Sequence, residues 1–163
     1  MTKKIENNIL IPFQAEQLRE GKEVIFTPTG VSMRPFIEGG KDTVVLRKLP
    51  DIQIGDIVLA AVQCTTSNSV AVQPPTAQRP NIRYVLHRVI AIDGENVTLM
   101  GDGNIGTTEH CTLADVLGTV VRIETARGRR KPLTRGRLWY YLRRKRRIML
   151  KVYRKLLKLG VLE

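Results

Sequence analysis

Between residues 24 and 124 the chain consists of short runs rich in aliphatic and β-branched residues, joined by connections that are too short for helical crossovers. Such runs are typical of β-strands. Parallel strands need a crossover of a dozen or more residues, usually a helix, whereas antiparallel strands do not. The pattern therefore predicts a mainly β body of antiparallel strands. The expected strands occupy residues 24–27, 43–47, 56–62, 82–92, 97–100 and 117–124.

Two local signals refine this body. Asp93-Gly94 lies between two expected strands and is typical of a hairpin turn. Residues 63–82 are rich in Gln, Ser, Thr and Pro, so we expect a surface insertion loop without packed structure of its own. Residues 1–126 are then long enough for one compact β domain.

The amino-terminal region adds a short helix to the β body. Residues 11–20 fit a helix, with Pro12 in the first turn and Gly21 placed to end it. Residues 1–8 are polar and lack the apolar segment of a secretory signal. No apolar run approaches the ~20 residues that cross a bilayer, so we expect a cytoplasmic protein.

The net charge of +12 is carried by the carboxyl-terminal quarter of the chain. Residues 1–126 hold 12 Lys or Arg against 14 Asp or Glu, whereas residues 127–163 hold 15 against one. Residues 127–137 are basic with two glycines and a proline, which suits a linker, and residues 138–163 are expected to form a detached basic amphipathic helix. Its apolar stripe is predicted to contain Leu138, Tyr141, Leu142, Met149, Val152, Leu156 and Leu159.

The basic helix is expected to bind an anionic membrane surface, at the inner face of the membrane. Each Lys or Arg near anionic headgroups contributes about 1 kcal/mol, and an apolar face rich in leucine and aromatic residues suits the lipid interface. Docking of this face on the body is the first alternative. Nucleic acid, whose phosphates the run 143–147 would attract, is the least favoured partner.

Cysteines and metal ligands point to no cofactor. Cys64 and Cys111 are too few for a disulfide framework, so we expect two unpaired thiols. Residues 109–111 combine Glu, His and Cys, but neighbouring side chains on an extended segment point in opposite directions. No further pair has the spacing of a metal site, and we expect neither a metal nor an organic cofactor.

Two segments carry the candidate chemistry. Ser32 lies in the segment 30–35, and His87 lies in the strand-like run 84–90. A serine hydroxyl becomes a good nucleophile when a base accepts its proton, and histidine is a usual base near neutral pH. The chain has only two histidines, so a Ser32–His87 pair is a specific hypothesis.

Four motifs in order give this chain a family resemblance. Together they resemble the type I signal peptidases, in particular the subgroup with a histidine base where the usual bacterial enzymes have lysine. The resemblance covers about residues 29–121 and implies coiled antiparallel sheets forming a partly open barrel, a fold shared with the LexA-like repressors. The motifs are Gly30-Val31-Ser32-Met33-Arg34-Pro35, Gly55-Asp56-Ile57-Val58, His87-Arg88-Val89 and Gly101-Asp102-Gly103-Asn104.

The resemblance implies a role for each motif. Ser32 resembles the nucleophile and His87 the general base. Met33 resembles a residue that lines the pocket for a small substrate side chain, and Gly30 and Pro35 belong to the same substrate-binding segment.

An acidic residue is expected to orient His87, and two candidates remain. Asp102 resembles the acid of the Gly-Asp-x-Asn motif, and we prefer it. The histidine-type enzymes also carry an Asp pair six residues later, where this chain has Thr107-Thr108 followed by Glu109. Either Asp102 or Glu109 could therefore complete a Ser-His-acid triad.

These residues imply a serine endopeptidase that cleaves a signal- or leader-type peptide, or a preprotein, after a small residue. Besides Thr107-Thr108, two further features depart from the family. Gly30 stands where many relatives have a serine whose hydroxyl assists the oxyanion, and no transmembrane anchor precedes Ser32. The alternative is a catalytically degenerate domain that keeps the fold and binds a peptide or a membrane.

Overall fold

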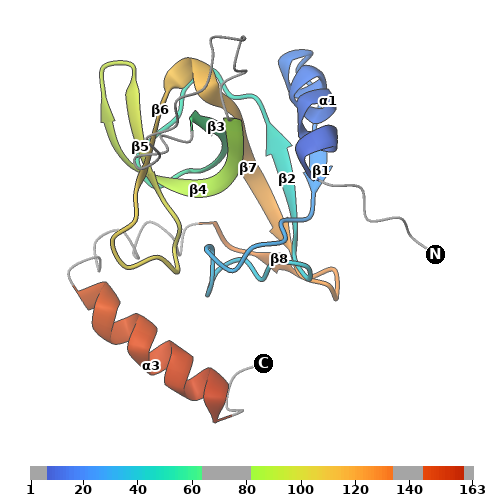
Figure 1. Ribbon diagram of the computed structural model, residues 1–163. Helices are drawn as coiled ribbons and strands as arrows, with labels where there is room; N and C mark the ends of the chain where they lie inside the picture. The colour runs from blue at the N-terminus through green and yellow to red at the C-terminus, as the bar shows by residue number, and fades with distance from the viewer. Residues whose placement is uncertain (1–6, 64–81, 134–144, 160–163) are drawn as a thin grey trace, which may run out of the picture.

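The computed structural model describes residues 7–63, 82–133 and 145–159 of the chain. Within these residues, eight strands form one antiparallel sheet, accompanied by a helix near each end of the chain (Figure 1). The strands are β1 (Val24–Phe26), β2 (Thr43–Arg47), β3 (Ile57–Gln63), β4 (Ile82–Asp93), β5 (Asn96–Met100), β6 (Glu109–Thr112), β7 (Val116–Glu124) and β8 (Arg130–Lys131). The helices are α1 (Asn7–Arg19), the short 3-10 helix η1 (Leu113–Asp115) and α3 (Arg146–Lys158).

The strand order is β1-β2-β7-β3-β4-β5-β6, with β8 beside β7. Each pairing among the described strands is antiparallel, as predicted. The register shifts after Val45, Leu59 and Val89, and such bulges bend a strand and increase its twist. Within the described residues the sheet is therefore coiled but not closed, and β1 and β6 stand at the two ends of the order (Figure 1).

Strand β3 lies in the middle of the sheet and is buried on both faces. Because side chains alternate along a strand, Ile57 and Leu59 enter one core while Val58 and Ala60 enter another. The first core contains Ile11, Leu18, Val24, Phe26, Met33, Ile37, Val44, Leu46, Ile57, Leu59, Leu86, Val120 and Ile123. The second contains Val58, Ala60, Val62, Val85, Val89, Val97, Leu99 and Val116.

Helix α1 covers the first core through Ile11 and Leu18, with Ala15 buried between them. It begins at Asn7, four residues before the predicted start, so Pro12 lies inside the helix rather than in its first turn. A proline at this position removes one backbone hydrogen bond, and burial of the apolar face against the sheet outweighs that loss. Gly21, at φ +79°, follows the end of the helix as predicted.

The predicted strands are all present, with ends that differ by at most one residue. Gly94 lies at the tip of the predicted hairpin between β4 and β5. The expected insertion, residues 63–82, begins and ends on Gln63 and Ile82, which pair with each other. The rest of it, residues 64–81, lies outside the described residues.

Strands β6 and β8 were not predicted, and β8 corrects the expected linker at 127–137. Arg130 pairs with Glu124 of β7, and the Lys131 Nζ donates to the Asp42 carboxylate at 2.6 Å. A short basic strand has no apolar alternation to reveal it, because its attachment is made by backbone pairing and an ion pair. Arg130 and Lys131, which lie within the expected linker, therefore pair with the β body.

Helix α3 is docked on the body, which corrects the expectation of a detached helix. Leu150 is only 1% exposed, and the Arg154 guanidinium donates to the Gly103 carbonyl at 3.4 Å. Val152 and Leu159, which belong to the predicted apolar stripe, are 53% and 64% exposed.

The predicted stripe and the buried residues differ because α3 has more apolar residues than one face can bury. Packing against the rest of the chain then determines which of them are buried. Residues 138–144 of the predicted helix lie outside the described residues. Within the described parts of the chain, no helix is both long enough and apolar enough to cross a membrane.

The docking of α3 predicts a specific effect of Leu150→Asp. Burying a carboxylate at this position is costly, so the helix should leave the body and its amides should exchange at least about tenfold faster, while β3 keeps its protection. The matched control is Ile148→Asp, at a position that is 66% exposed. Hydrogen exchange that is equally protected in both variants would contradict docking through Leu150.

Candidate active site

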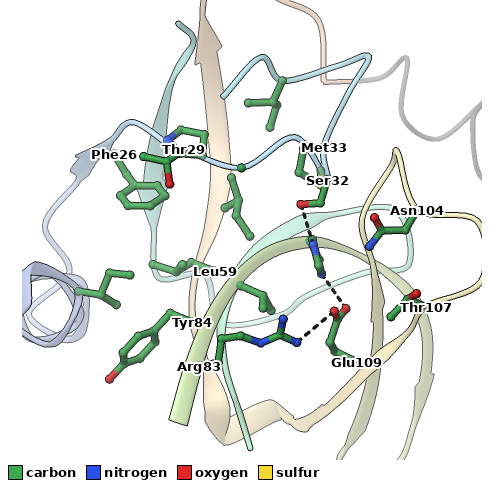
Figure 2. A pocket seen from close by; sticks show the side chains of 17 residues that line it. Phe26, Thr29, Ser32, Met33, Leu59, Arg83, Tyr84, Asn104, Thr107 and Glu109 are labelled. Carbon is green, nitrogen blue, oxygen red and sulfur yellow. Dashed lines mark hydrogen bonds and ion pairs between the residues drawn. The ribbon is translucent and has the colours of Figure 1, made fainter. Parts of the chain in front are cut away.

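Ser32 lies in the turn that follows β1, next to two apolar anchors. Met33 and Ile37 are buried in the first core, and the Ile37 N–H donates to the Met33 carbonyl at 3.0 Å. The Arg34 N–H closes a tighter turn on the Val31 carbonyl at 3.2 Å. Because these anchors hold the turn, Ser32 remains half-buried with its hydroxyl directed at β4 (Figure 2).

His87 lies on β4, paired with Val58 of the central strand β3. The imidazole is 5% exposed, and its Nε2 lies 2.9 Å from the Ser32 Oγ. Two residues that are 55 positions apart in the chain are therefore in hydrogen-bond contact. The structure brings together the two residues that the sequence pairs as nucleophile and base.

Glu109, the first residue of β6, contacts the other ring nitrogen. Its Oε2 lies 2.7 Å from the His87 Nδ1 (Figure 2). An ionised carboxylate only accepts hydrogen bonds, so this contact favours the tautomer with the proton on Nδ1 and leaves Nε2 to accept the Ser32 O–H. The Arg83 guanidinium lies 3.4 Å from the other carboxylate oxygen, the Glu109 Oε1.

Asp102, the preferred candidate for the acid that orients His87, pairs with Arg88 in the structure. Both Asp102 oxygens accept from Arg88, at 2.9 Å from Nε and 2.6 Å from Nη2. The same guanidinium donates to the Gly55 carbonyl at 2.6 Å. Arg88 follows His87 on β4, and successive side chains of a strand point to opposite faces, so an acid that pairs with Arg88 is directed away from the imidazole.

The segment after β5 supports Ser32 from behind. The Gly103 N–H donates to the Ser32 carbonyl at 2.6 Å. A Cβ on Gly101 would lie 2.7 Å from that carbonyl oxygen and 2.9 Å from the Ser32 Cβ. Only glycine fits such a close approach, so the Gly-Asp-Gly-Asn motif has a packing role at the turn of Ser32.

A cavity of about 520 Å³ opens beside Ser32 and His87. Its lining is mixed: apolar side chains such as Phe26, Met33 and Leu59 form one part, and charged and polar groups gather where Glu109 and Asn104 lie (Figure 2). It is lined by Ile11, Phe26, Pro28, Thr29, Gly30, Ser32, Met33, Ile37, Leu59, Arg83, Tyr84, Val85, Leu86, His87, Asn104, Thr107 and Glu109.

Of the three expected substrate-binding residues, Met33 and Gly30 line this cavity and Pro35 does not. Pro35 lines a separate hollow with Phe36, Ile123 and Lys131, among others. The turn at Ser32 separates the cavity from this second hollow, because the chain reverses direction between Gly30 and Pro35. Pro35 therefore shapes the turn rather than the cavity wall.

One edge of β4 faces the cavity. The backbone of Val89 forms hydrogen bonds with the segment that leads into β3. Its N–H donates to the Asp56 carbonyl at 2.8 Å, and its carbonyl accepts from the Gly55 N–H at 2.9 Å. Backbone groups alternate in direction along an antiparallel strand, so the N–H and C=O of Tyr84 and Leu86 point away from β3. Among the described strands, β5 pairs with β4 only from Arg88 onward.

The described residues contain no group of three or more His, Cys, Asp or Glu side chains placed to hold a metal ion. Cys111 is a free thiol, and burial, with a smaller contribution from Asp115, raises its pKa to about 11. Such a thiol is a poor nucleophile at neutral pH. Cys64 lies outside the described residues.

Comparisons of the chain with protein-family models, curated proteins and solved structures found no match. The chemistry of the site is therefore argued from its geometry. That geometry consists of the contacts among Ser32, His87 and Glu109, with Arg83 at the outer end.

The pairing of Arg88 with Asp102 predicts a large cost for Asp102→Asn. Removing one partner of a buried ion pair leaves an uncompensated charge, which costs about 3–5 kcal/mol, and the two side chains are only 3% and 1% exposed. Glu16→Gln breaks the exposed pair with Arg19 and should cost less than about 1 kcal/mol. Urea denaturation measures both, and equal losses would contradict the structural role of Asp102.

Proposed function

We propose that this chain is a serine endopeptidase of the signal-peptidase type, which cleaves signal- or leader-type peptides or preproteins after a small residue. The observation that carries the proposal is the hydrogen-bonded series from the Ser32 Oγ through His87 to the Glu109 carboxylate. In such a series a histidine activates a serine hydroxyl. The ordered motifs and the open antiparallel sheet support a fold of the LexA and signal-peptidase type.

The proposed reaction proceeds through an acyl-enzyme. The Ser32 Oγ attacks the peptide carbonyl carbon while the His87 Nε2 accepts the hydroxyl proton. Glu109, at 2.7 Å from Nδ1, stabilises the imidazolium that forms. When the C–N bond breaks, His87 returns the proton to the leaving amine. A water molecule then attacks the ester carbonyl and gives a proton to His87; as the acyl C–Oγ bond breaks, His87 returns that proton to the Ser32 Oγ and the acid product leaves.

The substrate is proposed to bind as an added strand along β4. Extended peptides bind sheet edges through main-chain hydrogen bonds, and the outward backbone groups of Tyr84 and Leu86 suit this mode. The apolar cavity wall at Met33 and Leu59 would receive the small side chain that precedes the cleaved bond. The proposed place of action is the cytoplasm, on leader segments of small exported or modified peptides.

One observation favours the alternative, a catalytically degenerate module that binds peptides. An oxyanion hydroxyl at position 30 is missing, because that residue is glycine. Loss of one oxyanion donor costs on the order of 10²- to 10³-fold in rate. The Ser32 N–H and the neighbouring Thr29 are the groups proposed to hold the oxyanion instead. Space for a side chain exists, since a Cβ on Gly30 would meet only the Ser32 Oγ, at 3.9 Å.

A fluorophosphonate probe tests the proposed nucleophile. We expect the probe to label the wild-type chain on Ser32, because His87 activates this hydroxyl, and to leave Ser32→Ala and His87→Ala unlabelled. The matched control is Thr27→Ala, which removes an exposed hydroxyl five residues away and should label like the wild type. Absence of labelling in the wild type would favour the degenerate module, and unchanged labelling of His87→Ala would reject histidine as the base.

Glu109→Gln tests the acid. An amide can donate to Nδ1 and so favours the wrong tautomer of His87, which should lower the labelling rate on the order of 10²- to 10⁴-fold. Glu95→Gln, at an exposed position in the turn after β4, serves as the control and should react at the wild-type rate. Equal rates for the two variants would remove Glu109 from the mechanism. The thermal unfolding of each variant is measured as well, so that a lower labelling rate caused by the wrong tautomer is distinguished from one caused by unfolding.

A further inference from the structure

We infer that the outward face of α3 binds the surface of an anionic lipid membrane while its inward face remains docked on the body. This surface lies outside the proposed active site and would bind lipid whether or not Ser32 is a nucleophile. Two features of α3 define it: exposed apolar side chains opposite Leu150, and a row of positively charged side chains on one flank between Leu150 and that strip.

The inward face holds the orientation of α3. Leu150 is buried, and Met149, Tyr153 and Leu156 are partly buried on the same side. Burial and the nearby Glu38 carboxylate raise the pKa of Tyr153, which places the ring beside the segment that follows Ser32. The Arg154 guanidinium also donates to the Gly103 carbonyl, so these groups hold α3 beside the body.

The outward face is apolar where a solvated helix would be polar. Ile148, Val152 and Leu159 are 66%, 53% and 64% exposed. At 3.6 residues per turn, all three fall within about 20° of the direction opposite Leu150. Single exposed apolar residues are ordinary, but an aligned strip of three on a docked helix marks a contact surface.

The charges beside this strip are all positive. The segment Arg146–Lys158 contains no acidic residue, and its exposed cations fill the arc between the docked face and the apolar strip. They are Arg147, Lys151, Arg154, Lys155 and Lys158. A helix with cations beside an apolar strip lies in the plane of a bilayer interface, with the cations at the headgroups and the strip among the acyl chains.

The apolar strip distinguishes a membrane from other partners. A nucleic acid offers phosphates to the cations, but its backbone has no apolar surface for Ile148 and Val152. A second copy of α3 would bring two rows of cations together, which is unfavourable. An anionic bilayer offers negatively charged headgroups to the cations and acyl chains to the apolar strip. It is therefore the partner that best fits this surface.

Vesicle co-sedimentation of the full chain tests this surface. We expect binding to vesicles of equal parts phosphatidylglycerol and phosphatidylcholine, weakened by salt, and at least about tenfold weaker binding to phosphatidylcholine alone. Lys151→Glu combined with Lys155→Glu should weaken binding to the anionic vesicles by at least about tenfold. The charge control is Lys22→Glu combined with Lys41→Glu, at exposed positions of the body, which should bind within about threefold of the wild type.

The apolar strip is tested in the same assay by Ile148→Ser combined with Val152→Ser. Loss of this apolar area should weaken vesicle binding at least about fivefold, whereas Ile25→Ser on β1, 67% exposed, should have no effect. Unchanged binding of the strip variant would overturn the inference. So would wild-type binding to duplex DNA that is tighter than binding to the anionic vesicles. Circular dichroism of each variant confirms that the helix and the sheet are retained.

Discussion

The buried ion pair between Arg88 and Asp102 is the interaction on which the arrangement of the site depends. It links the middle of β4 to the segment after β5, and that segment in turn holds the Ser32 carbonyl through the Gly103 N–H. His87 and Arg88 are neighbours on one strand and point to opposite faces. One face therefore presents the imidazole to the serine hydroxyl, while the other fixes the support on which the serine rests.

This division of labour between two acids follows from their surroundings. Asp102 is buried, and both of its carboxylate oxygens accept hydrogen bonds from the Arg88 guanidinium. Glu109 enters from another strand, keeps one oxygen for His87 and meets Arg83 with the other. The first carboxylate maintains structure, and the second is placed to orient the proposed base. Both acids lie near glycines or threonines in the sequence, and only the strand geometry distinguishes their roles.

Sequence reasoning predicted the strands because aliphatic alternation is local, and it predicted the Ser32–His87 contact because few residues of those types were available. It did not identify Glu109 as the carboxylate in contact with His87, because pairing across strands depends on register, which a motif does not contain. A useful signal was present: an arginine beside His87 on a buried strand needs an acidic partner of its own, and Asp102 is the natural one. The docked arc of α3 and the strand β8 were missed because both depend on tertiary contacts rather than on periodicity.

The strand order gives the site a further property. Ser32 follows β1 and Glu109 begins β6, and these strands are the two outermost members of the order, while His87 lies between them on β4. The contacts of His87 with Ser32 and Glu109 consequently connect the two ends of a sheet that is not closed. The distances among these three side chains therefore depend on the curvature of the whole sheet. A substitution at a remote bulge that flattened the roll would pull the hydroxyl and the carboxylate away from the ring without touching any of the three.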